Sequence, residues 1–435
     1  MKKLLSVLFI LLAIVGFAFA GGSQEAAPAT PAAQATDSGL PTVKIGVVSG
    51  LDADGKITGY YYQFAMDLIT EEAKAAAKDL GVNFEFIYRD YGGESSVLKQ
   101  RMSELKAAGC VTILALCADD FGPAVAQWAS ENKTPVLFAA NYSTQMSIVN
   151  YSDYIFATGL NAWGFIKVLA SEAVGKKGYK TYAYVGTDGA GAIDAENLLL
   201  YEGRKYNPDF KCVASYRMSH TDTEFSTIVS TILSMKEIPE MTLQQGGYNV
   251  ISFIMQASMY DFYDYSTIWS DVVIMPSIVT ALVDAGVYSY KGSYGASTFA
   301  WWDPGFKDFY DKYTASTGQA PMDFALYGYW AGKAAVEAIS ACVKSGKDYT
   351  NGDVLTAALS EVEFESCGSK HSFRDIDHQL SMNIYFIEAT DAGEEYNHIP
   401  LPADKSAVYT AEEYLPTKEE MKTYAETVLN VKNRF

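Results

Sequence analysis

The chain has 435 residues, of which 49% are hydrophobic and 14% aromatic, so it can build a large buried core. Its formal net charge is −19 at pH 7. Nucleic acids and anionic membrane surfaces bind clustered Lys and Arg, so this charge argues against both as partners.

The first twenty residues have the pattern of an export signal. Two lysines precede an apolar stretch from Leu4 to Phe19, and Ala18-Phe19-Ala20 has the small-x-small form of a signal peptidase site. A membrane anchor is the alternative, but the stretch is short and no basic flank follows it. Position 21 is Gly and not a lipid-accepting Cys. We therefore expect residues 1–20 to be a cleaved signal peptide and the protein to be periplasmic or otherwise extracytoplasmic.

Residues 21–41 are rich in Ala, Pro, Gln, Ser and Thr and have almost no apolar bulk. Such a segment cannot bury enough surface to offset its ordering entropy, so we expect a disordered linker. From Thr42 onward roughly 390 residues remain, which is too many for one typical core and favours two domains.

Five cysteines in an exported chain leave at least one of them unpaired within the chain. Cys342 and Cys367 flank a polar helical stretch, and we expect a disulfide between them. Cys110 and Cys117 flank one strand and would lie about 20 Å apart, which is too far to bridge. No cysteine spacing resembles a zinc site, and we expect neither a metal nor a cofactor.

Four apolar, β-branched runs stop abruptly in loops of small and polar residues, each followed by a helical pattern. Buried parallel strands have this appearance, and ligands of open α/β sheets bind in the loops at the carboxyl ends of the strands. We therefore expect the functional residues in these loops. The runs end at Ser49-Gly50, Ala118-Asp119-Asp120, Ala139-Ala140-Asn141 and Gly186-Thr187-Asp188-Gly189.

From Thr42 onward, strands alternate with helices, which predicts right-handed βαβ units and parallel sheets. A short edge or crossover strand at Tyr154-Ile155-Phe156 separates two such series. Expected strands of the first series cover 43–48, 83–88, 111–116 and 135–138, with helices at 64–80, 95–108 and 122–132. Expected strands of the second cover 181–185, 211–216, 241–245 and 272–275, with helices at 162–174, 190–207, 224–235 and 250–260.

After residue 293 the pattern is a strand at 293–300, helices at 305–317, 324–345 and from Asp353, and an extended stretch at 382–387. If the first sheet needs this later material, the chain crosses between the lobes more than once. We expect hinges near 157–161, 291–297 and 372–381. The predicted lobes are then 42–158 with 294–376, and 159–293 with 377–435.

Six short segments resemble, in order, the type I periplasmic binding proteins of the leucine/isoleucine/valine-binding kind. The resemblance covers about Thr42 to Ile387. The segments are Lys44-Ile45-Gly46-Val47-Val48-Ser49-Gly50, Tyr154-Ile155-Phe156-Ala157-Thr158-Gly159, Tyr184-Val185-Gly186-Thr187-Asp188, Asp222-Thr223-Glu224-Phe225-Ser226, Gly246-Gly247-Tyr248 and Phe324-Ala325-Leu326-Tyr327-Gly328-Tyr329.

This resemblance implies an α/β fold of two Rossmann-like lobes, each a parallel sheet flanked by helices, joined by three crossovers. It also implies a monomeric extracytoplasmic receptor that closes on a small polar, amino-acid-like metabolite. The closed form would dock on the membrane permease of an ABC importer, because hinge closure reports occupancy as a change of shape.

Asp119 and Asp120 stand where the resemblance implies a small hydroxyl residue and backbone N–H groups for a ligand carboxylate. If the two aspartates face the cleft, they repel a carboxylate and favour an ammonium, amide or polyol. Equally open is that Asp120 caps the helix that begins near Gly122 while Asp119 points to solvent.

The remaining ligand candidates lie in loops that the resemblance places at the cleft. Hydroxyl and amide groups in the loop after residue 138 can donate and accept, although a turn with a capping Ser or Thr is the simpler interpretation. Aromatic side chains can stack on a planar or apolar part of a ligand, although many of them must be core. The candidates are Ser49, Tyr60 or Tyr61, Ala140, Asn141, Tyr142, Ser143, Trp163, Asp188, Gly189, Tyr248 and Ser277.

Enzyme motifs are not apparent in the sequence, which has no G-x-S-x-G, H-E-x-x-H or C-x-x-C pattern. His220, His371, His378 and His398 have no ligand spacing, and we expect each to be a surface or capping residue. We therefore expect no enzymatic activity. An exported sensory ligand-binding protein and an exported α/β hydrolase with a spatially assembled triad remain alternatives.

Overall fold

A computed structural model describes residues 39–50, 56–139, 142–219, 222–245, 249–270, 278–279, 282, 293–389 and 407–432, and for 56–61, 249 and 250 it describes the backbone alone. The predicted signal peptide and residues 21–38 of the predicted linker lie outside the described residues. Thr42–Phe435 forms one unit apart from Met1–Pro41, and it contains every described helix and strand.

The first sheet has five parallel strands in the order β2-β1-β3-β4-β5. The apolar runs predicted to be buried strands form β1, β3 and β4, and β4 is buried along its whole length. The short strand predicted at residue 155 is β5, at the edge of the sheet. The strands are β1 (Thr42–Ser49), β2 (Asn83–Asp90), β3 (Cys110–Leu116), β4 (Val136–Phe138) and β5 (Ile155–Ala157).

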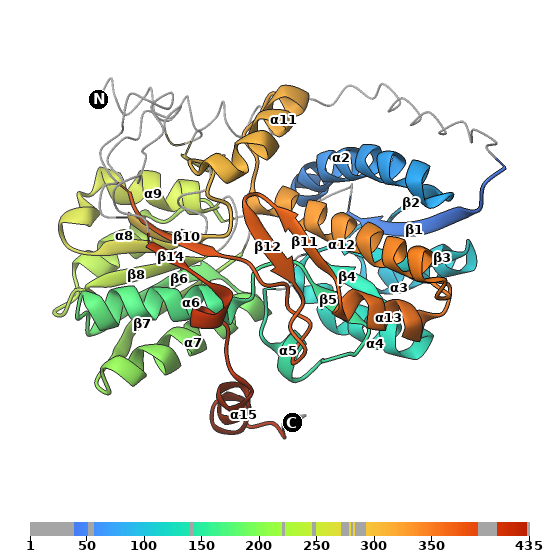
Figure 1. The fold of residues 1–435 in the computed structure, drawn as a ribbon. Coiled ribbons are helices and arrows are strands. Elements are labelled where there is room, and N and C mark those ends of the chain that lie inside the picture. The colour runs from blue at the N-terminus through green and yellow to red at the C-terminus, as the bar shows by residue number, and fades with distance from the viewer. Residues whose placement is uncertain are drawn as a thin grey trace. The chain divides into compact units, whose positions relative to one another are not determined.

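One face of this sheet is covered by α2 (Lys56–Leu80) and α12 (Asp323–Ser345), which lie side by side although they are far apart in sequence (Figure 1). Glycines on α12 permit the close approach, because a Cβ at Gly328 would lie 2.7 Å from the Tyr62 ring. The other face is covered by α3 and α4, whose apolar side chains form a separate buried cluster with Ile113. These and the neighbouring elements are α3 (Ser95–Ala107), η2 (Asp119–Phe121), α4 (Gly122–Asn132), α5 (Gln145–Ile148), η5 (Pro304–Phe306), α11 (Lys307–Thr317), α13 (Gly352–Ser360) and the hairpin of β11 (Glu363–Ser366) and β12 (Ser369–Ser372).

The second sheet has seven described strands in the order β14-β13-β10-β9-β8-β6-β7. Five of them, β10, β9, β8, β6 and β7, pair in parallel, as predicted, but β13 pairs antiparallel with both β10 and β14, so this sheet is mixed. The strand expected at 272–275 lies outside the described residues, and β9 comes before it. The strands are β6 (Thr181–Thr187), β7 (Lys211–Met218), β8 (Met241–Gln245), β9 (Thr267–Ser270), β10 (Ser293–Ser297), β13 (Ile384–Glu388) and β14 (Ala407–Tyr409).

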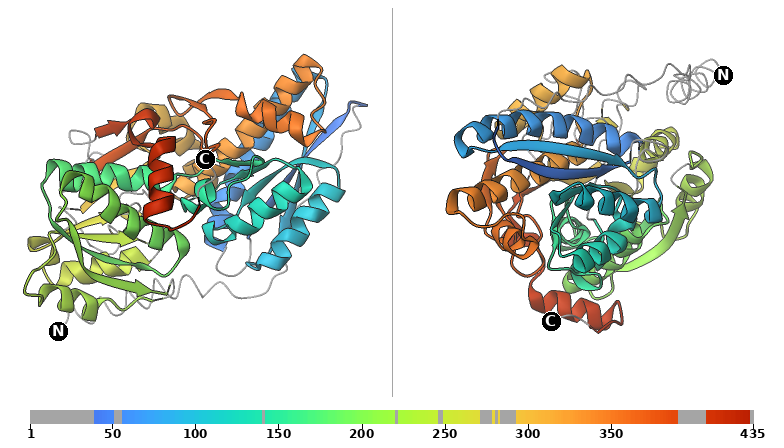
Figure 2. Two further views of the ribbon diagram at one scale, coloured as in Figure 1. Left: turned by 90° about the horizontal axis from the view of Figure 1, so that it is seen from below. Right: turned by 90° about the vertical axis from the view of Figure 1, so that its right-hand side faces the viewer.

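Helices α6 and α7 pack against each other beside this sheet, and α8 packs against α9. The last helix, α15, is the red helix near the C-terminus in Figure 2. It is held to α6 and α7 because Glu420 accepts hydrogen bonds from Lys167 at 3.1 Å and Lys205 at 3.1 Å. Among the described helices, none combines the length and the hydrophobicity that a membrane crossing requires. The helices are α6 (Ala162–Ala170), continued by a π-helical turn η3 (Ser171–Lys176), α7 (Ala190–Tyr206), α8 (Ser226–Leu233), α9 (Asn249–Met259), η4 (Phe262–Asp264), α14 (Ala411–Tyr414) and α15 (Lys418–Thr427).

Three connections link elements of the two sheets, at residues 158–161, 298–303 and 373–383. The strand β10 belongs to the second sheet, where Gly295 pairs with Ser270 of β9 and Ile387 of β13. The second connection therefore begins after Ser297. The lobe boundary predicted between residues 293 and 294 falls inside β10, after its first residue.

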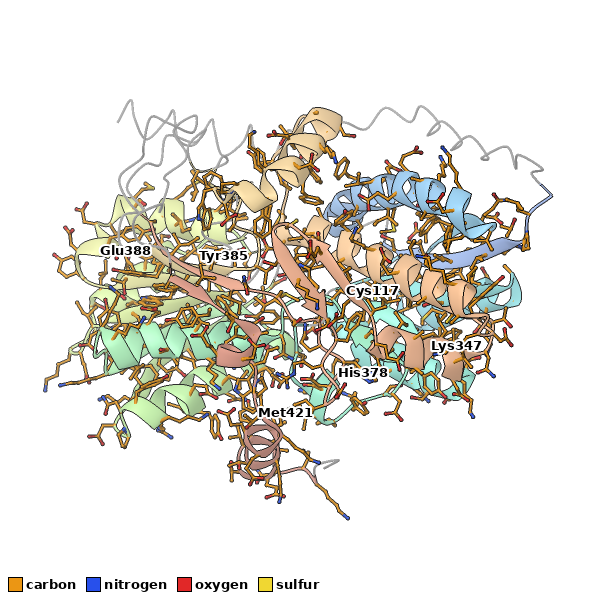
Figure 3. The ribbon with its side chains drawn as sticks, viewed as in Figure 1. Cys117, Lys347, His378, Tyr385, Glu388 and Met421 are labelled. Carbon is orange, nitrogen blue, oxygen red and sulfur yellow. The ribbon has the colours of Figure 1, made fainter. Side chains whose placement is uncertain are left out.

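Hydrogen bonds join the third connection to the first, and the second connection to α12. Gln379 donates to the carbonyl of Gly159 at 2.7 Å and thereby links the third connection to the first. His378, labelled in Figure 3, lies in the third connection. Its ring stacks on that of Phe156 of β5, with ring centroids 4.3 Å apart. Asp323 accepts from Ser297 at 2.9 Å and from Thr298 at 3.3 Å, which fixes the second connection to the start of α12.

The predicted disulfide between Cys342 and Cys367 is not formed, and all five cysteines are free thiols. The hydroxyl of Ser366, next to Cys367, accepts a hydrogen bond from the indole of Trp330. Trp330 precedes Cys342 by twelve residues on α12, which is about 18 Å along a helix and beyond the reach of a disulfide. The prediction was wrong because the segment after α12 folds back along the helix.

Candidate functional site

The loop after β4 is the centre of the candidate site, and its described residues Tyr142, Ser143 and Thr144 are called the 142–144 loop below. Asp119 lies in the turn η2 that follows β3. Its Oδ1 accepts hydrogen bonds from the backbone N–H groups of Tyr142 at 2.9 Å and Ser143 at 2.8 Å. The neighbouring parallel strands β3 and β4 bring the two loops together at their carboxyl ends, as predicted.

Asp194 holds the same loop from the second sheet's side. It lies on α7, is 1% exposed, and its Oδ2 accepts from the Ser143 hydroxyl at 2.7 Å, the Thr144 N–H at 2.8 Å and the Thr144 hydroxyl at 2.8 Å. Asp194 is not among the site residues predicted from the sequence. A signal was present, since this acid falls on the apolar stripe of α7 that includes Gly191, Ala195 and Leu198.

Two further contacts connect the 142–144 loop to elements of the second sheet. The side-chain amide of Gln245, at the end of β8, donates to the Tyr142 hydroxyl at 2.6 Å. The N–H of Ala162, the first residue of α6, donates to the Tyr142 carbonyl at 2.7 Å. Gln245 was also missed, because a Gln in a strand buried on both faces carries no distinctive pattern.

The start of α7 packs closely on this loop. A Cβ built on Gly191 would lie 2.9 Å from the Tyr142 ring and 3.0 Å from Asp119 Oδ2, distances that real Cβ atoms avoid. A Cβ on Gly189, the N-cap of α7, would lie 3.9 Å from both carboxylate oxygens of Asp120. The predicted Asp120 and Gly189 therefore face each other, with an acid beside a helix N-terminus where its charge is favourable.

Three buried oxygens at this junction have no hydrogen-bond partner in the structure: Asp119 Oδ2, Asp194 Oδ1 and Gln245 Oε1. The buried hydroxyl of Ser49, on the strand next to β3, also has none. Ser49 ends β1 and is 7% exposed. Unpartnered buried oxygens are rare in folded proteins, and a bound donor is one way to satisfy them.

Burial is the main electrostatic influence on the two acids. It raises the pKa of Asp119 to about 7, against the hydrogen bonds from Ser143 and Tyr142, and the nearby carboxylates of Asp120 and Asp194 raise it further. Burial likewise raises the pKa of Asp194, against its hydrogen bonds from the 142–144 loop. Both acids therefore lie where a positive charge or a hydrogen-bond donor would stabilise their ionised form.

The alternative interpretation of the aspartate pair is wrong on both counts. Helix α4 has Phe121 as its N-cap and no side-chain capping hydrogen bond, so Asp120 does not cap it. Asp119 does not point to solvent, because its carboxylate holds the 142–144 loop. Asp120 and Asp188 are the exposed acids of the group.

Trp163 is a core residue and does not join this group. Its side chain is fully buried, its indole N–H donates to Glu202 at 2.7 Å, and its ring lies 4.9 Å from that of Tyr424 on α15. The expectation of aromatic cleft surface at this position was wrong, because α15 covers the helix that carries it.

The other predicted ligand residues are not described at side-chain level. The side chains of Tyr60 and Tyr61 lie outside the described part of the chain, although their backbone belongs to α2. Ala140, Asn141, Tyr248 and Ser277 lie outside the described residues. Their part in the site stays a prediction.

The two described histidines are buried, which corrects the expectation of surface residues. His371 is 2% exposed, with Nδ1 2.8 Å from the carbonyl of Ser381, and His378 is 8% exposed, with Nδ1 3.1 Å from the carbonyl of Ile155. Both lie at the third connection and not at the 142–144 loop. Among the described residues, no three His, Cys, Asp or Glu side chains come close enough together to hold a metal ion.

Solved structures show the same fold. A leucine-, isoleucine-, valine-, threonine- and alanine-binding protein from Brucella ovis has a TM-score of 0.72 and 16% identity, over 87% of this chain and 97% of that one. A solute-binding protein of an ABC transporter from Rhodopseudomonas palustris BisB5, in complex with 3,4-dihydroxybenzoic acid, has a TM-score of 0.69 and 20% identity, over 80% and 93%.

No curated protein matches the sequence. The family model described as "Periplasmic binding protein" matches residues 42–394, which is most of the chain. This match agrees with the resemblance seen in the six sequence segments and with two sheets joined by three connections. The chain belongs to the periplasmic binding protein family.

Proposed function

We propose that the chain is an extracytoplasmic receptor that captures a small polar, amino-acid-like metabolite at the junction of its two sheets and delivers it to the permease of an ABC importer. One observation carries the proposal. The 142–144 loop contacts Asp119 after β3, Asp194 on α7 and Gln245 at the end of β8, so polar groups from both sheets meet at one place.

A junction of this kind suits reversible capture. A solute that contacts both sides favours the arrangement in which the two sides are close, and a permease can distinguish that arrangement from the empty one. Of the solved structures named above, one is a solute-binding protein of an ABC transporter and the other binds leucine, isoleucine, valine, threonine and alanine. We propose the same role here, with the protein acting as a monomer and without catalysis.

The first test is a binding screen on the chain from Thr42 onward. Thermal shift and calorimetry against amino acids, amides, polyamines and nucleosides should find a stabilising solute. At a hundredfold excess over its dissociation constant the ligand adds about 2.7 kcal/mol to the free energy of unfolding. Recovery of the bound solute unchanged by mass spectrometry supports a receptor, whereas a chemically altered product supports the hydrolase alternative.

Transport and sensing are separated by uptake. In cells that lack the protein, uptake of the radiolabelled ligand should fall and should return when the gene is restored. Normal uptake together with a lost cellular response to the ligand would favour the sensory alternative.

A further inference from the structure

The backbone of the 142–144 loop forms an anion site that is already occupied. Two successive N–H groups, of Tyr142 and Ser143, converge on a single carboxylate oxygen of Asp119 at 2.9 Å and 2.8 Å. Successive backbone N–H groups that converge in this way are a common means of holding an anion. Here the anion is a side chain of the same protein.

Three further donors of the loop, from Ser143 and Thr144, are also taken. Asp194 Oδ2 accepts hydrogen bonds from the Thr144 N–H at 2.8 Å, the Ser143 hydroxyl at 2.7 Å and the Thr144 hydroxyl at 2.8 Å. A ligand carboxylate could use these donors only by displacing an internal carboxylate. It would also meet the negative charge of the displaced group at short range, which is costly in a buried place.

The groups of this junction that remain available to a ligand are hydrogen-bond acceptors. Asp119 Oδ2 and Asp194 Oδ1 are buried and without a partner. Among the described residues, the charged groups with the largest effect on the pKa of Asp119 are Asp120 and Asp194, both of them acids. The complement of such a site is a cationic hydrogen-bond donor, and an ammonium group has three N–H donors and no acceptor.

We propose that Asp119 is a specificity-determining residue, whose carboxylate takes the place of a ligand carboxylate at the 142–144 loop, so that the site selects small amines over carboxylic acids. This inference rests on the proposed function and narrows its ligand class. Asp194 provides the second acceptor from the other sheet's side.

The test compares ligands that differ in the group at issue. Leucine amide and leucine differ only in the carboxylate, and putrescine and succinate are four-carbon chains with opposite charges. We expect the wild-type chain to bind leucine amide at least about tenfold more tightly than leucine, and putrescine at least about tenfold more tightly than succinate, as measured by calorimetry. Benzylamine and benzoate provide an aromatic pair.

Variants then assign the preference to one residue. Asp119→Ser frees the two N–H groups and removes the charge, so the amine-to-acid affinity ratio should fall by about tenfold or more. Asp119→Asn keeps an acceptor for the loop and should lower amine affinity without a gain for acids. Asp308→Ser, which removes an exposed acid on α11, is the matched control and should leave the ratio unchanged.

The outcomes separate this inference from the proposed function. Tighter binding of the acids by the wild-type chain, or binding of only an uncharged solute, overturns the inference and leaves a receptor. An Asp119→Ser chain that is less stable but has the wild-type ratio shows that Asp119 only holds the loop, which also overturns it. If no solute of any class binds, the proposed function itself fails.

Discussion

One carboxylate oxygen of Asp194 accepts three hydrogen bonds from the 142–144 loop, so this side chain largely determines how the loop is held to α7. Removing it leaves two hydroxyls and one N–H of a buried loop without their acceptor. Unsatisfied buried donors are costly, since each loses its hydrogen bonds to water without replacement.

We therefore expect Asp194→Ala to lower the free energy of unfolding by roughly 3 kcal/mol, measured by urea denaturation. Asp194→Asn should cost less, because the amide oxygen can still accept. Asp209→Ala, which removes an exposed acid after the same helix, is the control and should change stability by less than about 0.5 kcal/mol. Equal losses for Asp194→Ala and Asp209→Ala would contradict the assigned role.

Single residues also show what the sequence could and could not reveal about the site. Asp119, Tyr142 and Ser143 were predictable, because apolar runs end directly before their loops and parallel strands bring such ends together. Asp194 was not, because its partner Ser143 is 51 residues away and belongs to another sheet's loop. Trp163 was misplaced, since an aromatic residue near a connection gives no indication that α15 covers it.

At the scale of elements, the approach of α7 to the 142–144 loop depends on a helix residue without a side chain. A Cβ at Gly191 would lie 2.9 Å from the Tyr142 ring, and the hydrogen bond from Gln245 to the Tyr142 hydroxyl limits how far this ring can move. Overpacking of a buried contact costs about 1–3 kcal/mol, which exceeds the gain in helix propensity from Gly to Ala.

Gly191→Ala should therefore lower stability by about 1–2 kcal/mol relative to Gly189→Ala in the same turn. The Gly189 variant meets only the Asp120 oxygens, at 3.9 Å, which is an ordinary contact. Chemical denaturation of the two variants side by side gives the difference. A Gly191→Ala chain at least as stable as the Gly189→Ala chain would show that the helix can move away freely.

Elements were predictable to different degrees. The buried strands of both sheets other than β9, and most helices, were predicted because their apolar runs and periodicities are strong. The hairpin of β11 and β12 was missed because its strands are short and mostly polar, and only the turn at Cys367 and Gly368, both with positive φ, marks it. Pairing direction was also beyond reach for β13, whose antiparallel partner β10 lies some ninety residues earlier.

At the scale of the whole molecule, buried acids with raised pKa values make the free energy of unfolding decrease as the pH rises. Burial raises the pKa of Asp323 from 3.8 to about 6, against its hydrogen bonds from Ser297, Tyr327 and Thr298. A group whose pKa is higher in the folded state holds its proton more tightly there. Its contribution is complete below pH 3.8 and is lost as the pH rises through the folded value.

We expect the contribution of Asp323 to the free energy of unfolding to fall by roughly 3 kcal/mol as the pH rises from about 3 to about 7, because its unfolded pKa is 3.8 and its folded pKa about 6. Asp119, whose pKa is also raised, acts in the same direction. Asp323→Asn keeps an acceptor for Ser297 and cannot ionise, so its profile should be flatter by about that amount. Denaturant titrations at each pH measure both chains. Parallel profiles for the wild type and Asp323→Asn would contradict the assignment.

At low pH the free energy of unfolding should decrease through a different group, Glu420. Burial tends to raise the pKa of Glu420, but the Thr417 N–H and the ammonium groups of Lys167 and Lys205 outweigh it and lower the pKa to about 2. The contribution of Glu420 is present above the unfolded value of 4.5 and is lost as the pH falls through the folded one. The attachment of α15 to α6 and α7 should therefore weaken in strong acid.

The interleaved path of the chain has a consequence for its synthesis. Strands β1 to β5 are complete once Ala157 has left the ribosome, but α12, which covers one face of that sheet, begins only at Asp323. Until then apolar side chains such as Ile45 and Val47 lack the packing partners that α12 provides. The nascent chain thus exposes one apolar face of the first sheet while more than a hundred further residues are translated. Exposed apolar surface of this kind is what chaperones bind.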